Sequence, residues 1–269
     1  MTKSIVALFV ERKYLMFIVK LNAKTVATLG IALTHKNMKN ISIKNIKVSL
    51  LALLIASFSI LYCSDDTKSD LTAEEILNQS SLKLDTWTSF RFGLEHEKGL
   101  TSLSNGLYQL KSVRGEVILP RRVKLETNVI TFGQLIKLDV VLIDGQSYWT
   151  NPINQKWSKI PEGQSPFGTF DVGEVILDIL SNMKSPEKLP TSSKNIEIIG
   201  KVDAEVFEPL VGVSDPGKIA DVTITIDLEN MNVISAEIAG KVNPLDEEDV
   251  VRIIEIWDVD VEFKVEPPL

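Results

Sequence analysis

Cysteine is the residue of this chain best suited to chemistry, and it occurs once, as Cys63. It follows an uncharged, apolar run of fifteen residues, 48–62, and precedes a polar stretch, 64–70, that holds three aspartates. Lysines stand ahead of the apolar run. A basic segment, a short apolar segment and then a cysteine at the cleavage point are typical of a bacterial lipoprotein signal. The pattern predicts that Cys63 becomes the first residue of the mature protein and carries acyl chains.

Two other interpretations of the apolar run are open. The first is a membrane-spanning anchor, which needs about 30 Å of helix. Fifteen residues rise only about 22 Å, so the run is short for that role. A buried core helix with an ordinary buried thiol is the second, and the basic and acidic flanks argue against it. Tyr62 departs from the signal pattern, which prefers a small residue directly before the cysteine.

The segment pattern predicts four parts. Residues 1–37 fit no signal and are interpreted as a non-native N-terminal extension, with translation starting at Met38. Residues 38–62 are the predicted signal peptide and 63–70 the acylated linker. Residues 71–269 are enough for one folded domain with a sizeable core.

Charge separates the two ends of the chain. Residues 1–62 hold nine of the 29 basic residues and one of the 36 acidic ones, so residues 63–269 carry a formal charge of −15. Such a balance argues against binding nucleic acid or anionic lipid headgroups. Membrane attachment must then come from the acyl chains, and we expect the protein on the extracytoplasmic face of the cell membrane.

Catalytic motifs are absent from the sequence. It has no Gly-x-Ser-x-Gly, no paired histidines for zinc and no phosphate-binding glycine loop. His96, the only histidine after Cys63, is interpreted as a solvated strand end. The acidic run 246–249 lacks calcium-loop spacing and is interpreted as a solvated turn. We therefore expect no enzyme, no metal and no cofactor.

Two helices are predicted in the domain. Thr72 with Glu75 three residues on forms a capping box, and the helix it opens has a loose apolar face of Ile76, Leu77, Leu82 and Leu84. A second helix is predicted over 172–183, where apolar residues fall at helical spacing behind a possible cap, Asp171.

Most of the remaining chain predicts antiparallel strands. Asp144-Gly145 is a hairpin signal, and Trp149 and Trp157 are expected as a cross-strand aromatic pair beyond it. A helical turn is expected near 204–208. The last hairpin is expected to join 251–257 to 259–265, where apolar and polar residues alternate strictly. The fold class is α+β.

Taken in order, these segments resemble the LppX/LprAFG family of bacterial lipoproteins. Residues 76–84 with 88–92 resemble the family's opening helix and first strand, and 144–149 with 156–161 resemble its central hairpin. Residues 222–227, 233–234 and the closing pair resemble its last strands, while 186–195 looks shorter than the family's hairpin.

The resemblance implies a fold and a function. The fold is a curved antiparallel half-barrel, similar to the LolA and LolB carriers, with helices on its concave face enclosing an apolar cavity. The function is that of a membrane-anchored lipoprotein that binds and carries lipids or glycolipids in the cell envelope, with an envelope transporter as a possible partner. The cavity-lining residues expected are Phe90, Phe92, Val172, Val175, Ile176, Ile179, Leu180 and Met183.

The residues themselves leave an alternative. A long sheet with one apolar face must be covered by helices, by curvature, by a ligand or by a partner. The protein could thus be a structural or signalling lipoprotein whose concave face binds another protein. The same eight residues could equally be ordinary core. The loop 166–168 is interpreted as a plain connection rather than a cavity lip.

Overall fold

The computed structural model describes residues 6–11, 14–19, 70–161, 164–165, 167, 170–190 and 194–269. The chain divides into two compact units, Met1–Asp66 and Thr67–Leu269. In the first unit, strands β1 (Val6–Glu11) and β2 (Tyr14–Val19) pair antiparallel. The predicted signal peptide and Cys63 lie outside the described residues.

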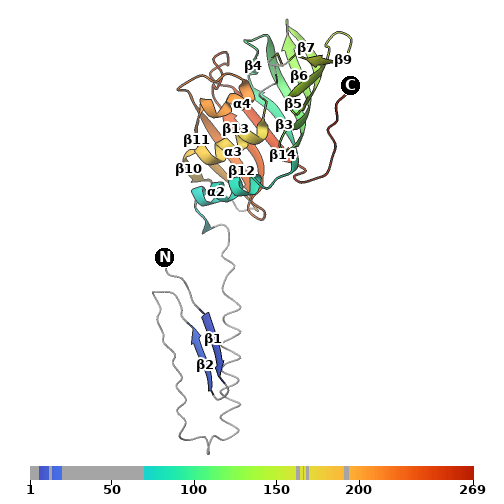
Figure 1. Ribbon diagram of the computed structural model, residues 1–269. Helices are drawn as coiled ribbons and strands as arrows, with labels where there is room; N and C mark the ends of the chain where they lie inside the picture. Colours follow the sequence, from blue (N-terminus) through green and yellow to red (C-terminus); the bar gives the residue numbers. More distant parts are fainter. Residues whose placement is uncertain are drawn as a thin grey trace, which may run out of the picture. The chain divides into compact units, whose positions relative to one another are not determined.

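The second unit is built on one antiparallel sheet of twelve strands (Figure 1). The strands are β3 (Ser89–Lys98), β4 (Thr101–Leu103), β5 (Tyr108–Ile118), β6 (Arg122–Thr131), β7 (Gln134–Ile143), β8 (Gln146–Thr150), β9 (Trp157–Ile160), β10 (Lys184–Lys188), β11 (Asn195–Asp203), β12 (Ile219–Asp227), β13 (Val233–Ala239) and β14 (Val251–Trp257). Their order is β10-β11-β12-β13-β14-β3-β5-β6-β7-β8-β9, with β4 paired to β5 beside this path. Because β9 and β10 are the two edges of this path, the curved sheet is an open half-barrel. The predicted α+β half-barrel is confirmed.

The helices cover only part of the sheet. They are α2 (Ala73–Leu84), α3 (Val172–Asn182), the 3₁₀ turn η3 (Ala204–Phe207) and α4 (Glu208–Val211). α2 contacts α3 and β10, and α3 contacts β11. In Figure 1 these helices lie in front of the half of the sheet formed by β10–β13, while β5–β9 extend beyond them.

Both long helices begin at the residues the sequence indicated. Thr72 Oγ1 accepts a hydrogen bond from Glu75 N at 3.2 Å, and Glu75 Oε2 accepts one from Thr72 N at 2.8 Å. Asp171 Oδ1 accepts a hydrogen bond from Glu174 N at 3.0 Å. These side chains satisfy amide groups that the first helical turn leaves without partners.

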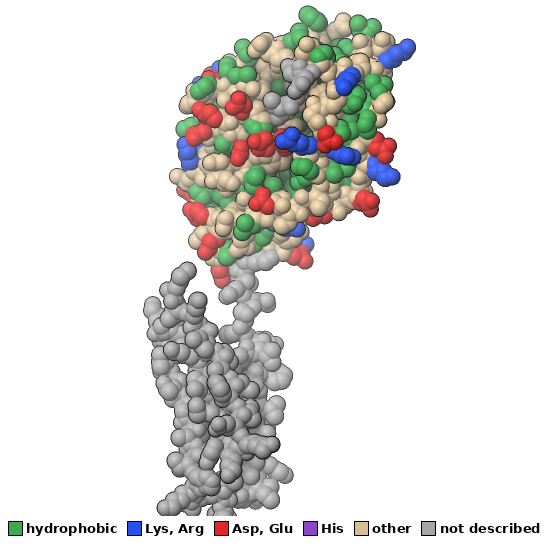
Figure 2. All heavy atoms as spheres, viewed as in Figure 1, with side chains coloured by type: hydrophobic (Ala, Val, Ile, Leu, Met, Phe, Trp, Pro, Cys, Tyr) green, Lys and Arg blue, Asp and Glu red, His purple; other side chains and the backbone are tan. Residues whose placement is uncertain are grey.

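Alternation along β3 separates the two faces of the sheet. Phe90, Phe92 and Leu94 are buried on the inner face, while Arg91 and Glu95 point to the opposite face. On that outer face Arg91 forms ion pairs with Glu116 at 2.9 Å and Asp258 at 2.8 Å. Figure 2 shows charged groups crossing the middle of the second unit, whereas its upper edge is mainly apolar or uncharged.

Two predictions about side-chain packing are wrong. Leu82 belongs to the exposed side of α2, at 61% exposure, because the buried face runs through Ile76, Leu77, Ser80 and Leu84. Trp149 and Trp157 are not a cross-strand pair, since Trp149 lies opposite Ser158 and Trp157 opposite Thr150. Neighbouring residues of a strand point to opposite faces, so the two indoles lie on different sides of the sheet.

The prediction of a final hairpin is also wrong. β14 exists, but the alternating residues 259–265 form no strand. Both sides of β14 are already taken, by β13 and by β3, so no edge is left for a further strand. The tail instead contacts the start of β3: Ser89 Oγ donates to the carbonyl of Val261 at 2.8 Å, and the Phe263 ring lies 5.1 Å from the Arg91 guanidinium carbon.

The edge strand β10 was missed. It contains Pro186 and has a bulge between Lys184 and Glu187 in its pairing with β11. Proline has no amide hydrogen to donate, so it is tolerated at a sheet edge, and a central strand would exclude it.

Candidate functional site

The eight residues predicted to line a cavity come together in one apolar cluster. Phe90 and Phe92 lie on the inner face of β3, at the centre of the sheet. Five more are buried on the face of α3 that turns toward the interior: Val172, Val175, Ile176, Ile179 and Leu180. Met183, at the end of α3, is half-buried against the same cluster. They share one interior, and whether they line a cavity there stays a prediction.

A glycine allows close approach inside this cluster. A Cβ added to Gly115 of β5 would lie 2.0 Å from Cε1 of Phe92, so the Phe92 ring occupies the space a side chain would take. A Cβ added to Gly173 of α3 would lie 3.6 Å from Cζ of Phe90, which is an ordinary contact distance. Gly115 therefore makes room for the Phe92 ring, whereas the Phe90 ring would tolerate a small side chain at position 173.

A row of aromatic rings crosses the interior. Centroid distances are 5.4 Å from Trp87 to Phe90, 6.3 Å from Phe90 to Phe92, 5.9 Å from Phe92 to Phe170, and 6.3 Å from Phe170 to Phe167. Such spacing is typical of stabilising ring pairs. Phe167 belongs to the segment interpreted as a plain connection, yet its side chain is buried in this row.

The apolar interior continues past the helices onto β5–β8. Buried side chains on the inner face are Leu110, Val113, Leu125, Val129, Leu138 and Val140. Half-buried ones packed against the cluster include Tyr108, Val123, Ile136, Leu142 and Trp149. The sequence predicted strands here but singled out none of these residues, although their alternation was a readable signal.

One polar group in this interior lacks a partner. The Ser80 side chain is 1% exposed on the buried face of α2, and its hydroxyl makes no hydrogen bond. An unsatisfied buried hydroxyl costs about 1–3 kcal/mol. A polar group of a bound molecule or a water would relieve that cost.

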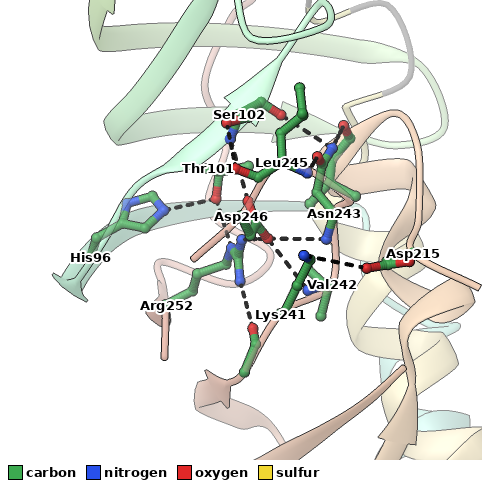
Figure 3. A network of polar contacts seen from close by, with 12 residues as sticks. His96, Thr101, Ser102, Asp215, Lys241, Val242, Asn243, Leu245, Asp246 and Arg252 are labelled. Carbon is green, nitrogen blue, oxygen red and sulfur yellow. Dashed lines mark hydrogen bonds and ion pairs between the residues drawn. The ribbon is translucent and has the colours of Figure 1, made fainter. Parts of the chain in front are cut away.

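A buried polar network closes one end of the sheet (Figure 3). The Arg252 guanidinium of β14 pairs with the Asp246 carboxylate, and both side chains are 0% exposed. Arg252 Nε also donates to Thr101 Oγ1 at 2.6 Å. Asp246 Oδ2 accepts hydrogen bonds from the amides of Val242 at 3.3 Å and Asn243 at 3.0 Å. The network thus joins β4, β14 and the β13–β14 connection.

Asp246 corrects the interpretation of residues 246–249 as a solvated turn. Residues 247–249 are exposed, whereas Asp246 is buried beside Arg252. The burial of Asp246 could not be predicted from the sequence, because a run of four acidic residues does not indicate which of them is buried. Among the described residues, no cluster of His, Cys, Asp or Glu side chains is arranged to hold a metal ion.

His96 belongs to the same network, and its interpretation as a solvated strand end is wrong. Its Nδ1 lies 2.9 Å from the carbonyl of Lys111 and its Nε2 lies 2.8 Å from Thr101 Oγ1. Burial lowers the pKa of His96 to about 4, and the nearby Arg252 charge acts in the same direction. The imidazole is therefore neutral at pH 7.

The outer side of α3 carries two carboxylates with altered acidity. Burial raises the pKa of Asp178, and burial together with Asp171 and Asp178 raises the pKa of Glu174. Their charged forms are thus disfavoured in the folded protein.

No helix in the described part of the chain has both the length and the apolarity needed to cross a membrane.

Together these features define a class of fold: an open half-barrel with an apolar interior under a partial helix layer. The chain belongs to the LppX_LprAFG lipoprotein family, whose family model matches residues 72–254. That family implies a membrane-anchored place in the cell envelope, and its members are not known as enzymes. No curated protein matches the chain.

Two solved structures share the fold. LprF from Mycobacterium bovis is 14% identical, with a TM-score of 0.54 over 73% of this chain and 96% of that one. The lipoprotein LppX from Mycobacterium tuberculosis is 13% identical, with a TM-score of 0.50 over 72% of this chain and 98% of that one. At such identities the likeness concerns the fold alone.

Proposed function

We propose that this protein binds the acyl chains of a lipid or glycolipid in its apolar interior and carries them in the cell envelope. The observation that supports this most is the extent of that interior. Buried apolar side chains run from α3 across β3 to β7, although α2, α3 and α4 lie over only the β10–β13 half. An acyl chain along the inner face of β5–β8 would extend the cover that the helices begin.

The energetics of a carrier suit such an interior. Removing a sixteen-carbon chain from water is worth about 13 kcal/mol, at about 0.8 kcal/mol for each methylene. The competing site is a bilayer, which is equally apolar, so transfer between the two is close to neutral and reversible. The Ser80 hydroxyl offers a polar contact inside an otherwise apolar interior.

We further propose that residues 38–62 are a signal peptide, that Cys63 carries the acyl anchor, and that residues 71–269 form the carrier domain. The division between units at Asp66 and Thr67 is in keeping with this boundary. Cys63→Ser should move the protein out of the membrane fraction. An acylated form persisting in that variant would contradict the proposal for the anchor.

Ligand binding is tested on protein purified from bacteria. Native mass spectrometry and lipid extraction should recover acyl-chain lipids bound to the protein. Ile136→Trp places a large ring on the inner face of β7, beside the interior, and should lower lipid occupancy severalfold.

Ile130→Trp is the matched control. Ile130 is equally half-buried but lies on the outer face of β6, because inner Val129 pairs with Ile136 whereas Ile130 pairs with exposed Leu135. It should leave lipid occupancy unchanged. Equal occupancy in both variants, or protein that carries no lipid at all, would overturn the proposed function.

A further inference from the structure

Large apolar side chains are exposed at one end of the sheet, on the connections between strands. Five of them are 47–91% exposed, and we call them the apolar tip: Leu107, Phe132, Leu135, Val213 and Leu245. They come from the β4–β5 turn, the β6–β7 hairpin, the α4–β12 connection and the β13–β14 connection. This is the end drawn uppermost in Figures 1 and 2.

The connections that carry the tip touch one another. Thr131 Oγ1 donates to the carbonyl of Leu107 at 2.9 Å, which joins the β6–β7 hairpin to the β4–β5 turn. A Cβ on Gly106 would lie 3.4 Å from Cδ1 of Leu245, so that turn also contacts the β13–β14 connection. The tip is therefore one surface, although its residues are far apart in sequence.

The buried polar network holds this surface in place (Figure 3). Asn243 Nδ2 donates to the carbonyl of Val213 at 3.0 Å, and Asn243 Oδ1 accepts from Leu245 N at 2.9 Å. The neighbouring Asp246 is fixed by Arg252. Two tip residues are thus fixed through their backbones to the core.

The five tip residues lie in uncharged stretches, although the connections that carry Val213 and Leu245 also hold charged residues. The segments 99–110, 127–136, 209–214 and 242–245 contain no Asp, Glu, Lys or Arg, in a chain that is 24% charged. The charged groups beside the tip are paired with one another: Lys98 with Asp249, Lys218 with Glu248 at 3.1 Å, and Lys241 with Asp215 at 3.7 Å. Only a shallow insertion, limited to the five apolar side chains, would leave these charged groups in water.

Phe132 is an unusual residue for its position. Its φ of +49° is left-handed, a conformation that favours Gly, Asn or Asp, and its side chain is 91% exposed. Asp144 occupies the equivalent position of the β7–β8 hairpin, with φ +48° and a glycine following, as Gly133 follows Phe132. The fold gains nothing from an aromatic ring at Phe132, so the strain and exposure point to a role outside the fold.

We propose that the apolar tip inserts into the interfacial layer of a lipid bilayer. Separate side chains projecting from turns suit the disordered apolar boundary of a bilayer, and an aromatic ring is favoured at that depth. The five tip residues are uncharged, and the formal charge of −15 over residues 63–269 argues against attraction to anionic headgroups as the driving force.

This insertion deepens the proposed carrier function by specifying where the carrier meets a membrane. The chain enters the domain at the other end of the sheet, where Leu71 precedes α2 and its carbonyl accepts from Lys188 Nζ at 2.6 Å. An anchor at Cys63 would hold that end, which leaves the tip free to meet a bilayer surface by itself.

A polarity-sensitive fluorophore tests the insertion directly. In the full chain with Cys63→Ser, the label is attached at Phe132→Cys and, as the matched control, at Asp144→Cys. On adding phosphatidylcholine vesicles, the label at 132 should shift to the blue and be quenched by lipid-borne quenchers, in 1 M NaCl as well as in low salt. The label at 144 should remain in water.

Phe132→Asn separates this role from stability. Asparagine fits the left-handed turn, so the thermal midpoint should stay equal or rise, while vesicle insertion should fall about tenfold, as monitored by a label at Leu245→Cys. Occupancy by copurified lipid should not change, so loss of insertion and loss of ligand binding are distinguished. Labels at 132 and 144 that both stay in water, or respond equally, would overturn the proposal. Insertion that requires anionic lipid would overturn it as well.

Discussion

Breaking the buried ion pair between Arg252 and Asp246 should be among the most damaging changes available in this domain. Arg252→Met keeps a long side chain but removes the cation. Asp246 would then be left in a site that is 0% exposed. Removing one partner of a buried pair costs about 3–5 kcal/mol, because the other charge stays desolvated without compensation. The Thr101 hydroxyl and the carbonyl of Gly240 also lose the donors that reach them at 2.6 and 3.3 Å.

Urea unfolding of the full chain measures this cost. Arg252→Met should lower the free energy of unfolding by about 3–5 kcal/mol. The control is Lys98→Met, which breaks the ion pair of Lys98 with Asp249, whose side chains are 57% and 58% exposed. An exposed pair contributes about 0–1 kcal/mol, so the control should cost little.

A double-mutant cycle isolates the coupling between the two charges. Asp246→Asn together with Arg252→Met should cost less than the sum of the single changes, by about 2–3 kcal/mol, because no unpaired charge remains buried. The reasoning is refuted if Arg252→Met costs as little as Lys98→Met, or if the two single costs add without coupling.

Three further outcomes follow from the structure. Because the folded pKa of His96 lies near 4, below its ordinary value of 6.5, its neutral form contributes stability above pH 6.5 that is lost as the pH falls toward 4. His96→Gln should remove about 3 kcal/mol of that acid sensitivity, in urea unfolding at pH 7 and pH 4; an unchanged pH slope would contradict the shift. Gly115→Ala should cost about 1–3 kcal/mol by overpacking against Phe92, and Phe92→Leu should recover part of it, whereas Gly93→Ala meets only ordinary contacts at 3.5 Å and should be mild. Since burial raises the pKa of Asp178, Asp178→Asn should raise the thermal midpoint at pH 7 and lose that advantage at pH 3, where the carboxyl is protonated in both states; an equal gain at both pH values would argue against the charge as the cause.

Local signals in the sequence were enough for the elements whose ends are encoded nearby. Both helix caps, at Thr72 and Asp171, and the hairpin at Asp144-Gly145 lie where the residues indicated. The interior cluster around Phe90 was also predictable, because alternation and helical spacing reveal which faces are apolar.

Long-range partners could not be read in the same way. The alternation of 259–265 is real, but which strand occupies each edge of β14 depends on the whole sheet. The pairing of Asp246 with Arg252 and the burial of His96 depend on three connections meeting at one end of the domain. β10 was hidden because its proline argues against any strand except one at an edge.

The pairing of β14 with β3 has a consequence for how the chain is made. β3 to β9 and β10 to β14 are each joined mostly through neighbours in sequence, and only this one pairing unites the two halves of the sheet. During synthesis from the amino end, the edge of β3 that pairs with β14 stays unpaired until residues 251–257 are available. The sheet is therefore complete only after residues 251–257 have been synthesised. Until then one edge of β3, the strand that carries Phe90, is unpaired and open to mispairing with another strand.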